Sequence, residues 1–420
     1  MDTDLLRRLA SPEGFEVLRL ARDLARGEEH FLDDWAALRR SGAEKELARG
    51  ALETVLLRAR AEKKFSRAGE MFFTRAGLEQ ASAEPVSRHR AARFRGMERI
   101  ADLGCGIGGD TLALADCAPV WAVDLDELRL RMARENLRAY APAGPVHFLL
   151  ADILRPVFSA AARKRMAIFC DPSRREDARR VFSVRRYSPP LEAVTRLYGA
   201  AALCVKISPG VRWEEIEEEP CEAEFVSFEG ELREGVLWYG PLRTTLRRAT
   251  ILPADLTMTE KEPDSDAVSP PRAVLYEPDP SLLRAGLVRQ LAARLGAARI
   301  DPEIADLTAD EFLPTPWARA YRIEESMPFG LKRLREWLRA RGVGRVTVKK
   351  RGSPLEPDAL ERQLKLRGEE SRILFLTRVG GKPYVLIAQD VLSSAQARGS
   401  FPSEDEGGAR RGLWRNDTSF

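Results

Sequence analysis

The chain has 420 residues, which is long enough for two or three domains with apolar cores of their own. Its 68 Lys and Arg against 64 Asp and Glu give a net charge of +4, which permits a nucleic-acid partner without requiring one. No apolar run approaches the roughly 20 residues of a membrane-spanning helix, and no signal-peptide pattern opens the chain. The five Cys are scattered, without C-x-x-C pairs or a nearby His cluster. We therefore expect free thiols, no metal site, no membrane contact and a cytoplasmic protein.

Residues 1–95 predict a helical N-terminal domain. Apolar residues recur three or four positions apart amid charged residues, for example across 15–24 and 52–57. Four arginines then lie within 87–95, just before the first expected strand. They could form one solvated helix face or face a phosphate group.

Residues 96–252 predict a doubly wound α/β sheet, because short apolar strands alternate with helical stretches. We expect strands at 99–103, 120–123, 146–149, 166–170, 202–207, 223–228 and 236–239. No helical stretch separates the last two, so they predict a closing antiparallel hairpin.

The first strand runs into a glycine-rich turn, IADLGCGIGGD at 100–110. Glycine tolerates positive φ and has no Cβ, so Gly104, Gly106 and Gly108 could bring the backbone close to a cofactor. The same glycines could belong to a plain strand-to-helix turn. With Gly109 they also satisfy the G-x-G-x-x-G pattern of dinucleotide sites.

Acidic residues stand at three further strand ends, which meet at one edge of a parallel sheet. Asp124 could accept hydrogen bonds from two ribose hydroxyls, and Asp152 could accept one from an adenine amino group. Asp171 ends the fourth strand, and Asp102 precedes the glycines. A cup lined by acids suits a positively charged sulfonium better than a pyrophosphate.

These motifs resemble those of the class I S-adenosylmethionine-dependent methyltransferases. DLGCGIG matches the first motif, AVDLD the second and LLADIL the third, and FCDPSRR occupies the fourth. Together with VKISPG, LYEPDP and GRVTVKKRG, they also make the chain similar to bacterial methyltransferases that carry a C-terminal THUMP-like domain. The resemblance implies a Rossmann-like class I methyltransferase sheet with an N-terminal helical domain and a C-terminal α+β (THUMP-like) domain. It further implies S-adenosyl-L-methionine as cofactor and RNA as partner.

The resemblance also implies where chemistry occurs. Methyltransferases of exocyclic amines carry an Asn/Asp-Pro-Pro-aromatic loop, which Asp171 and Pro172 match and Ser173 and Arg174 do not. Asp171 would orient the amine or accept its proton, and Arg174 would stack through its guanidinium or grip a phosphate. Alternatively, Asp171 caps a following helix.

Basic residues near this loop are candidate substrate contacts. Arg175 belongs to an arginine-rich stretch, 174–186, with Tyr187 beside it as an aromatic platform, and Lys206 ends the fifth strand. A salt-bridged surface and a strand-end lysine in solvent are the alternatives.

The remainder of the chain falls into three predicted parts. Residues 253–319, rich in Pro, Asp, Glu and Ser at their start, predict a linker and helical connector. Residues 320–391 predict an α+β (THUMP-like) domain, in which Lys349 and Lys350 would contact RNA. This domain also contains a predicted basic helix, which could contact RNA or could be an ordinary amphipathic helix packed on a sheet. Residues 392–420 are small and polar and predict a disordered tail.

We therefore expect a methyltransferase that acts on RNA (tRNA or rRNA), at a base amine. A methyltransferase for a small molecule or protein, or a non-catalytic RNA-binding protein that retains the fold, are the alternatives. The oligomeric state stays open.

Overall fold

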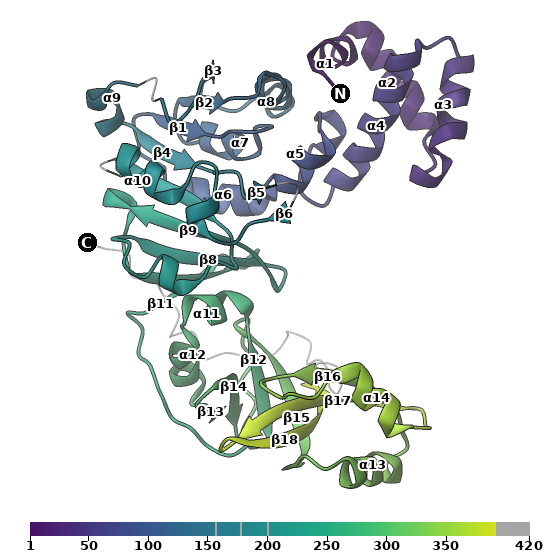
Figure 1. Ribbon diagram of the computed structural model, residues 1–420, viewed down its shortest axis with the longest axis vertical. Helices are drawn as coiled ribbons and strands as arrows, with labels where there is room; N and C mark the ends of the chain where they lie inside the picture. The colour runs from purple at the N-terminus through teal and green to yellow at the C-terminus, as the bar shows by residue number, and fades with distance from the viewer. Residues whose placement is uncertain (156–157, 177–178, 200, 392–420) are drawn as a thin grey trace, which may run out of the picture. The chain divides into compact units, whose positions relative to one another are not determined.

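The computed structural model describes residues 1–155, 158–176, 179–199 and 201–391, and it describes the backbone but not the side chains of 175, 176, 179 and 180 (Figure 1). The described chain forms two compact units. Unit 1 contains residues 1–265 and 278–294, and unit 2 contains 266–277 and 295–391. We describe each unit by itself.

Unit 1 begins with the predicted helices. They are α1 (Thr3–Leu9), α2 (Pro12–Leu24), α3 (Phe31–Arg40), α4 (Lys45–Ala61), α5 (Arg75–Gln80) and α6 (Glu84–Ala92). The start of α2 shows why the helices begin where they do. The Ser11 side chain accepts a hydrogen bond from the Gly14 N–H, and Pro12 occupies the first helical turn.

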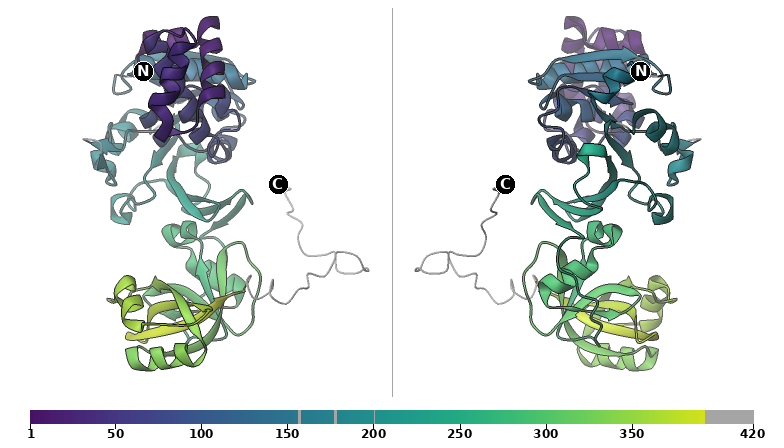
Figure 2. Two further views of the ribbon diagram at one scale, coloured as in Figure 1. Left: turned by 90° about the vertical axis from the view of Figure 1, so that its right-hand side faces the viewer. Right: turned by 90° about the vertical axis from the view of Figure 1, so that its left-hand side faces the viewer.

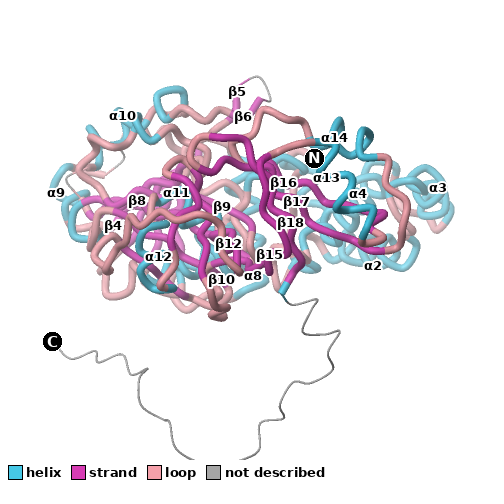
Figure 3. The backbone as a smooth tube through the Cα atoms, turned by 90° about the horizontal axis from the view of Figure 1, so that it is seen from below, coloured by secondary structure: helices cyan, strands magenta, loops and turns pink. Residues whose placement is uncertain are grey.

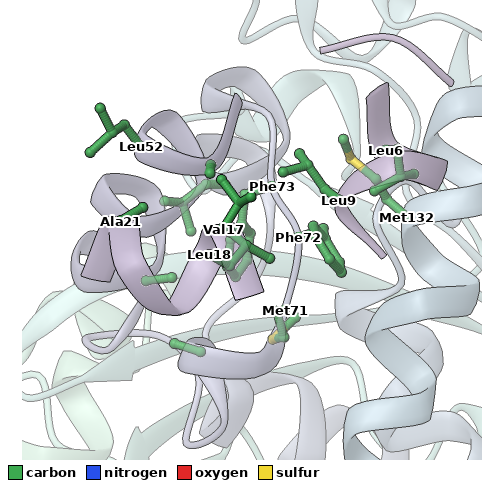
Figure 4. Close-up of a cluster of buried hydrophobic side chains, with 14 of the residues drawn as sticks. Leu6, Leu9, Val17, Leu18, Ala21, Leu52, Met71, Phe72, Phe73 and Met132 are labelled. Atoms are coloured by element: carbon green, nitrogen blue, oxygen red, sulfur yellow. The ribbon is translucent and has the colours of Figure 1, made fainter. Parts of the chain in front are cut away.

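The helices share one apolar core with the sheet that follows. Leu6, Leu9 and Phe72 are buried in the same cluster as Met132 and Ile107, which belong to the α/β part (Figure 4). Figure 2 shows the N-terminal helices, in purple, against the strands drawn in blue. The helical segment is therefore an integral layer of unit 1.

The sheet of unit 1 has the strand order β11-β10-β8-β9-β7-β4-β1-β2-β3. Its strands are β1 (Ile100–Leu103), β2 (Val120–Asp124), β3 (Val146–Leu150), β4 (Ala167–Cys170), β7 (Ala202–Ile207), β8 (Glu222–Phe228), β9 (Glu231–Tyr239), β10 (Arg247–Leu252) and β11 (Leu256–Thr259). Strands β3, β2, β1, β4 and β7 run parallel, whereas β9 is antiparallel to both β7 and β8. This confirms the predicted Rossmann-like sheet with its closing hairpin.

The central strands could be located because they are buried on both faces. Every residue of β1, β4 and β7 is buried, so these strands are almost continuous apolar runs. The crossover helices are α7 (Gly109–Ala115), α8 (Glu127–Tyr140), α9 (Ala160–Lys164) and α10 (Leu191–Tyr198).

The stretch 253–319 differs from the linker and helical connector expected there. It contains the predicted helices α11 (Pro280–Ala285) and α12 (Val288–Leu295), but also β11, β12 (Val274–Pro278), β13 (Ala298–Asp301) and β14 (Ile304–Ala309). Strand β11 adds antiparallel to β10 at the sheet edge, where two of its four side chains are exposed. An edge strand with few buried side chains lacks the apolar run by which the sequence reveals a central strand.

Unit 2 is built on a second sheet, in the order β13-β14-β12-β15-β18-β17-β16. After β14 come β15 (Ala318–Pro328), α13 (Leu331–Ala340), β16 (Val343–Lys350), α14 (Pro357–Leu364), β17 (Glu370–Val379) and β18 (Lys382–Asp390), which form the predicted α+β domain. Figure 3 shows β15 to β18 side by side. Leu334 and Leu338 of α13 pack with Leu364 of α14 in one core cluster with Leu374 and Val385 of the sheet.

Within the described ranges, no helix combines the length and the apolar character needed to cross a membrane.

Candidate active site

The glycine turn between β1 and α7 has no room for larger residues at its two ends. Gly104 has φ +82°, and a Cβ there would lie 2.9 Å from the carbonyl oxygen of Asp171. Gly108 has φ +86°, and its Cβ would lie 3.1 Å from Ala133 of α8. Between them, a Cβ on Gly106 would meet no atom within 4 Å. The turn is thus packed against the protein at its two ends and open at its centre.

Asp124, at the end of β2, is fixed against this turn. Its Oδ2 accepts the Gly106 N–H at 2.9 Å, and its Oδ1 accepts the Asp126 N–H at 3.0 Å. Each carboxylate oxygen has a second lone pair, so both can accept a further hydrogen bond. The predicted meeting of the first and second strand ends is therefore present.

Asp102, a predicted cofactor-binding residue, lies within the protein and not on an open face. Its side chain is fully buried, and its Oδ2 accepts a hydrogen bond from Thr111 Oγ1 at 2.5 Å. Burial, with the nearby charge of Asp110, raises the pKa of Asp102 to about 8. Through this bond Asp102 holds the start of α7.

Asp152 follows β3 and is half-buried. Its Oδ1 accepts the Leu154 N–H at 2.9 Å, and the neighbouring Ala151 N–H donates to the Asp124 carbonyl oxygen at 3.1 Å. Apolar side chains accompany the two acids, since Leu125 and Leu150 are 69% and 59% exposed. This edge of the sheet offers acids and an apolar surface together.

Asp171 couples the fourth strand end to the same turn. Its N–H donates to the Leu103 carbonyl oxygen at 3.2 Å, and its Oδ2 accepts a hydrogen bond from Lys206 Nζ at 2.6 Å. Residues 175–176 form the short strand β5 (Arg175–Glu176), so Asp171 does not cap a following helix. The buried Pro172 continues the loop.

Lys206 was predicted to contact substrate, and the structure buries it. Its side chain is 3% exposed, and its ammonium lies 3.8 Å from Asp110 Oδ2 in addition to its bond with Asp171. Lys206 lies on the central strand β7, and the carboxylates around its ammonium take the place of the water that would solvate an exposed lysine. Lys206 therefore holds Asp171 from within the protein.

Arg90, one of the four arginines before the first strand, completes the buried charge cluster. It is 2% exposed and pairs with both Asp110 and Glu234. Ser87 Oγ donates to Asp110 Oδ1 at 2.7 Å. Arg90 therefore has neither of the two predicted roles, on a solvated helix face or facing a phosphate, because its charge is neutralised inside unit 1.

Two of the residues expected beside Asp171, Arg174 and Tyr187, bond to the protein's own backbone. The guanidinium nitrogen Nη1 of Arg174 donates to the Ile207 carbonyl oxygen at 3.2 Å. Tyr187, predicted as an aromatic platform, is 2% exposed, and its hydroxyl accepts the Ser208 N–H at 2.8 Å. The side chain of Arg175 lies outside the described part of the structure.

Asn136 is a supporting residue that sequence reasoning missed. Its Nδ2 donates to the Ile107 carbonyl oxygen at 2.9 Å, and its side chain exchanges two hydrogen bonds with the Phe72 backbone. It thus ties the glycine turn to the N-terminal segment. The sequence could have indicated this role, because Asn136 is a polar amide within the buried apolar face of α8, which contains Met132, Ala133 and Leu137.

In unit 2, the two lysines predicted to contact RNA differ. Lys349 Nζ donates to Glu277 and, at 2.7 Å, to the Tyr321 hydroxyl, so its charge is paired inside the unit. The partner Glu277 is the acid of LYEPDP and lies on β12, and the Lys349 side chain is 22% exposed. Lys350 pairs with Glu356 at 2.6 Å, but both side chains are exposed.

The described residues contain no cluster of His, Cys, Asp and Glu that could hold a metal ion.

Comparisons with known proteins agree with this architecture. Family models match residues 318–390 as THUMP domain-like, 100–183 as a methyltransferase domain and 2–61 as a domain of unknown function. An uncharacterised S-adenosylmethionine-dependent methyltransferase of Mycobacterium tuberculosis is 37% identical over 341 residues, covering 78% of this chain and 92% of that protein. A trimethylguanosine synthase of Schizosaccharomyces pombe is 33% identical over 78 residues, covering 18% of this chain and 33% of the synthase.

A crystal structure described as a candidate methyltransferase of Porphyromonas gingivalis W83 shares the fold. It superposes with a TM-score of 0.70 at 20% identity, covering 90% of this chain and 98% of that chain.

The site fits the cofactor that these relatives name. The open space at Gly106 admits a ligand to the glycine turn, and the Asp124 carboxylate beside it retains acceptor capacity. The matched relative spans most of both chains and the four motifs meet at one sheet edge. The chain therefore belongs to the S-adenosylmethionine-dependent methyltransferases, and S-adenosylmethionine is its cofactor.

Proposed function

We propose that the protein methylates an amino group of an RNA base, in tRNA or rRNA. The observation that carries this proposal is the Asp171-Pro172 loop. It places a carboxylate directly beside the glycine turn, with the Asp171 N–H bonded to the end of β1. The THUMP domain-like match and the partial match to a trimethylguanosine synthase support a nucleic-acid acceptor.

Asp171 acts by orienting the acceptor amine. Lys206 holds its Oδ2, and no described residue donates a hydrogen bond to its Oδ1, while the side chain is 21% exposed. An amine N–H that donates to Oδ1 has its nitrogen lone pair held in one direction. The bound cofactor supplies a methyl group already activated on a sulfonium, so positioning provides much of the rate.

The cofactor contacts follow from the geometry of the strand ends. The Gly104–Gly108 turn would lie against the cofactor, with Gly106 at the closest approach. Asp124 would accept from the ribose hydroxyls, and Asp152 from the adenine amine. Asp102 would act indirectly, through Thr111 and the start of α7.

RNA contacts would come from cations that the protein does not neutralise internally. Lys350 has only an exposed partner, so a phosphate can replace that partner at little cost. Arg174 and Arg175 flank Asp171 in sequence. All five cysteines are unpaired, which supports a location in the cytoplasm, where thiols stay reduced.

Labelled S-adenosylmethionine, incubated with the protein and with total RNA from cells that lack it, tests the proposal. Label should enter RNA with the wild-type protein. Asp171→Ala should bind cofactor in calorimetry yet transfer no label, whereas Asp23→Ala, on the exposed face of α2, should behave as wild type. Unchanged transfer by Asp171→Ala would remove this residue from the mechanism.

The other outcomes identify the rival functions. Label found only in protein or in small molecules would reject RNA as the acceptor. Cofactor binding without transfer to any fraction would favour a non-catalytic RNA-binding protein.

A further inference from the structure

Asp110 is a buried carboxylate next to the glycine turn. It belongs to the first turn of α7, and its side chain is 11% exposed. Its Oδ1 accepts one hydrogen bond from Ser87 Oγ at 2.7 Å and another from Arg90, and both donors belong to α6. Burial raises the pKa of Asp110, but the charges of Arg90 and Lys206 outweigh it, so the pKa is lowered and the group is charged.

The second carboxylate oxygen of Asp110 lies near Lys206. The distance from Oδ2 to Lys206 Nζ is 3.8 Å, which makes an ion pair without a direct hydrogen bond. Lys206 Nζ in turn donates to Asp171 Oδ2 at 2.6 Å. Among the described residues, these two acids are the only ones that form ion pairs with this ammonium. Asp110, Lys206 and Asp171 therefore alternate in charge, from α7 through β7 to the loop after β4.

Neutralisation alone does not account for this arrangement. Arg90 already pairs with Asp110, and Asp171 alone would neutralise Lys206. A lysine side chain is flexible, so a single hydrogen bond to Asp171 leaves the place of the ammonium loosely defined. Asp110 attracts the same ammonium from a different element, and this attraction stays strong where little water is present. The two acids together therefore restrict where Nζ can lie.

Asp110 is itself held by buried groups on several elements. Arg90, which bonds to Asp110, also pairs with Glu234 of β9, and these two side chains are 2% and 3% exposed. Thr111, the residue after Asp110, donates to Asp102 Oδ2 of β1 at 2.5 Å. A carboxylate that is fixed by such bonds can define the position of another side chain.

We propose that Asp110 is a positioning residue for methyl transfer, which acts through Lys206 to hold the Asp171 carboxylate in the direction that orients the acceptor amine. This proposal rests on the proposed role of Asp171 and extends it to a residue that acts only through another side chain. Misplacing a reacting group by about 1 Å can cost about 100-fold in rate. Helix α6, which holds Asp110 through Ser87 and Arg90, thereby influences the rate of the reaction at the sheet edge.

Steady-state methyl transfer to total RNA, measured for Asp110→Asn, tests the proposal. We expect kcat to fall about 10- to 100-fold, while KM for RNA and the affinity for S-adenosylmethionine in calorimetry stay unchanged. Glu222→Gln is the matched control, because Glu222 is also a fully buried carboxylate but pairs with Arg93 and Arg248 instead of Lys206. Glu222→Gln should lose stability as Asp110→Asn does and keep the wild-type kcat.

A double variant distinguishes positioning from general damage. If Asp110 acts through Lys206, adding Asp110→Asn to Lys206→Met should lower kcat little further, because the link to Asp171 is already broken. Losses of kcat that multiply in the double variant would overturn the proposal. If Asp110→Asn does not fold, Ser87→Ala carries the test, since Asp110 then keeps its charge and loses the 2.7 Å bond to its Oδ1. Its kcat should fall with KM unchanged, and an unchanged kcat would overturn the proposal.

The remaining outcomes separate this proposal from the proposed function. If Asp171→Ala abolishes transfer and Asp110→Asn has the wild-type kcat, the positioning role is overturned while the role of Asp171 stands. An equal fall of kcat in Glu222→Gln would also overturn it, because lost stability would then explain the effect. If wild-type protein labels no RNA, or if Asp171→Ala labels RNA normally, the proposed function fails and the positioning role fails with it.

Discussion

The bond between Lys206 and Asp171 makes a strong prediction, because one partner is almost fully buried. At an effective dielectric constant of about 20, the 2.6 Å contact with Asp171 corresponds to a gross attraction of about 6 kcal/mol, and the 3.8 Å contact with Asp110 to about 4 kcal/mol. Desolvation of the ammonium opposes both attractions. Removing one partner of such a pair typically costs about 3–5 kcal/mol, because the other charge stays buried and unpaired. We expect Lys206→Met to lower the free energy of unfolding of unit 1 by about that amount.

A double-mutant cycle separates this pair from general damage to the core. Urea denaturation of wild type, Lys206→Met, Asp171→Asn and the double variant should give a coupling energy of about 1.5–3 kcal/mol, the range for hydrogen bonds to charged groups. Lys350→Met, at an exposed ion pair, should cost less than about 1 kcal/mol. Additive effects of the two single substitutions would refute the view that Lys206 acts by holding Asp171. So would a loss of stability in Lys350→Met equal to that in Lys206→Met.

Three further predictions concern other parts of the chain. Asp124→Ala should weaken S-adenosylmethionine binding in calorimetry at least tenfold, since it removes two charge-assisted acceptors, and unchanged affinity would exclude this carboxylate from the site. Lys349→Ala should lower the free energy of unfolding of unit 2 by about 3 kcal/mol. Lys350→Ala should leave that stability unchanged and weaken RNA binding in a filter assay. The reverse pattern would contradict the view that Lys349 is structural and Lys350 contacts RNA. Burial lowers the pKa of His89, but hydrogen bonds to Glu224 and Asp255 outweigh it, so the pKa is raised above 6.5. The stability of wild type relative to His89→Gln should therefore be greatest below pH 6.5 and fall as the pH rises through the folded pKa; a pH-independent difference would oppose this.

The sequence predicts the sheet better than it predicts the charges. Strands β1, β4 and β7 were found because strands buried on both faces are apolar throughout. The place of Asp124, at the end of a mostly apolar strand and against the glycine turn, was likewise predicted. Lys206 and Arg90 were misread because their partners are remote: Asp171 lies 35 positions from Lys206, and Glu234 lies 144 positions from Arg90. From sequence alone, a charged residue is predicted to be exposed, because the residue that neutralises it becomes a neighbour only in the folded protein.

The same contacts define the role of the N-terminal helices. Arg90 of α6 neutralises Asp110 and Glu234 under the active-site edge, and Phe65 packs against Gly109 at the start of α7. Without these helices, the sheet would keep two buried carboxylates and lose the cation between them, which is among the costliest changes to a core. The N-terminal helices are therefore required for the stability of the sheet that carries the active site. An RNA contact made by them would be added to that role, and exposed cations such as Lys350 are better candidates for contacts with the substrate.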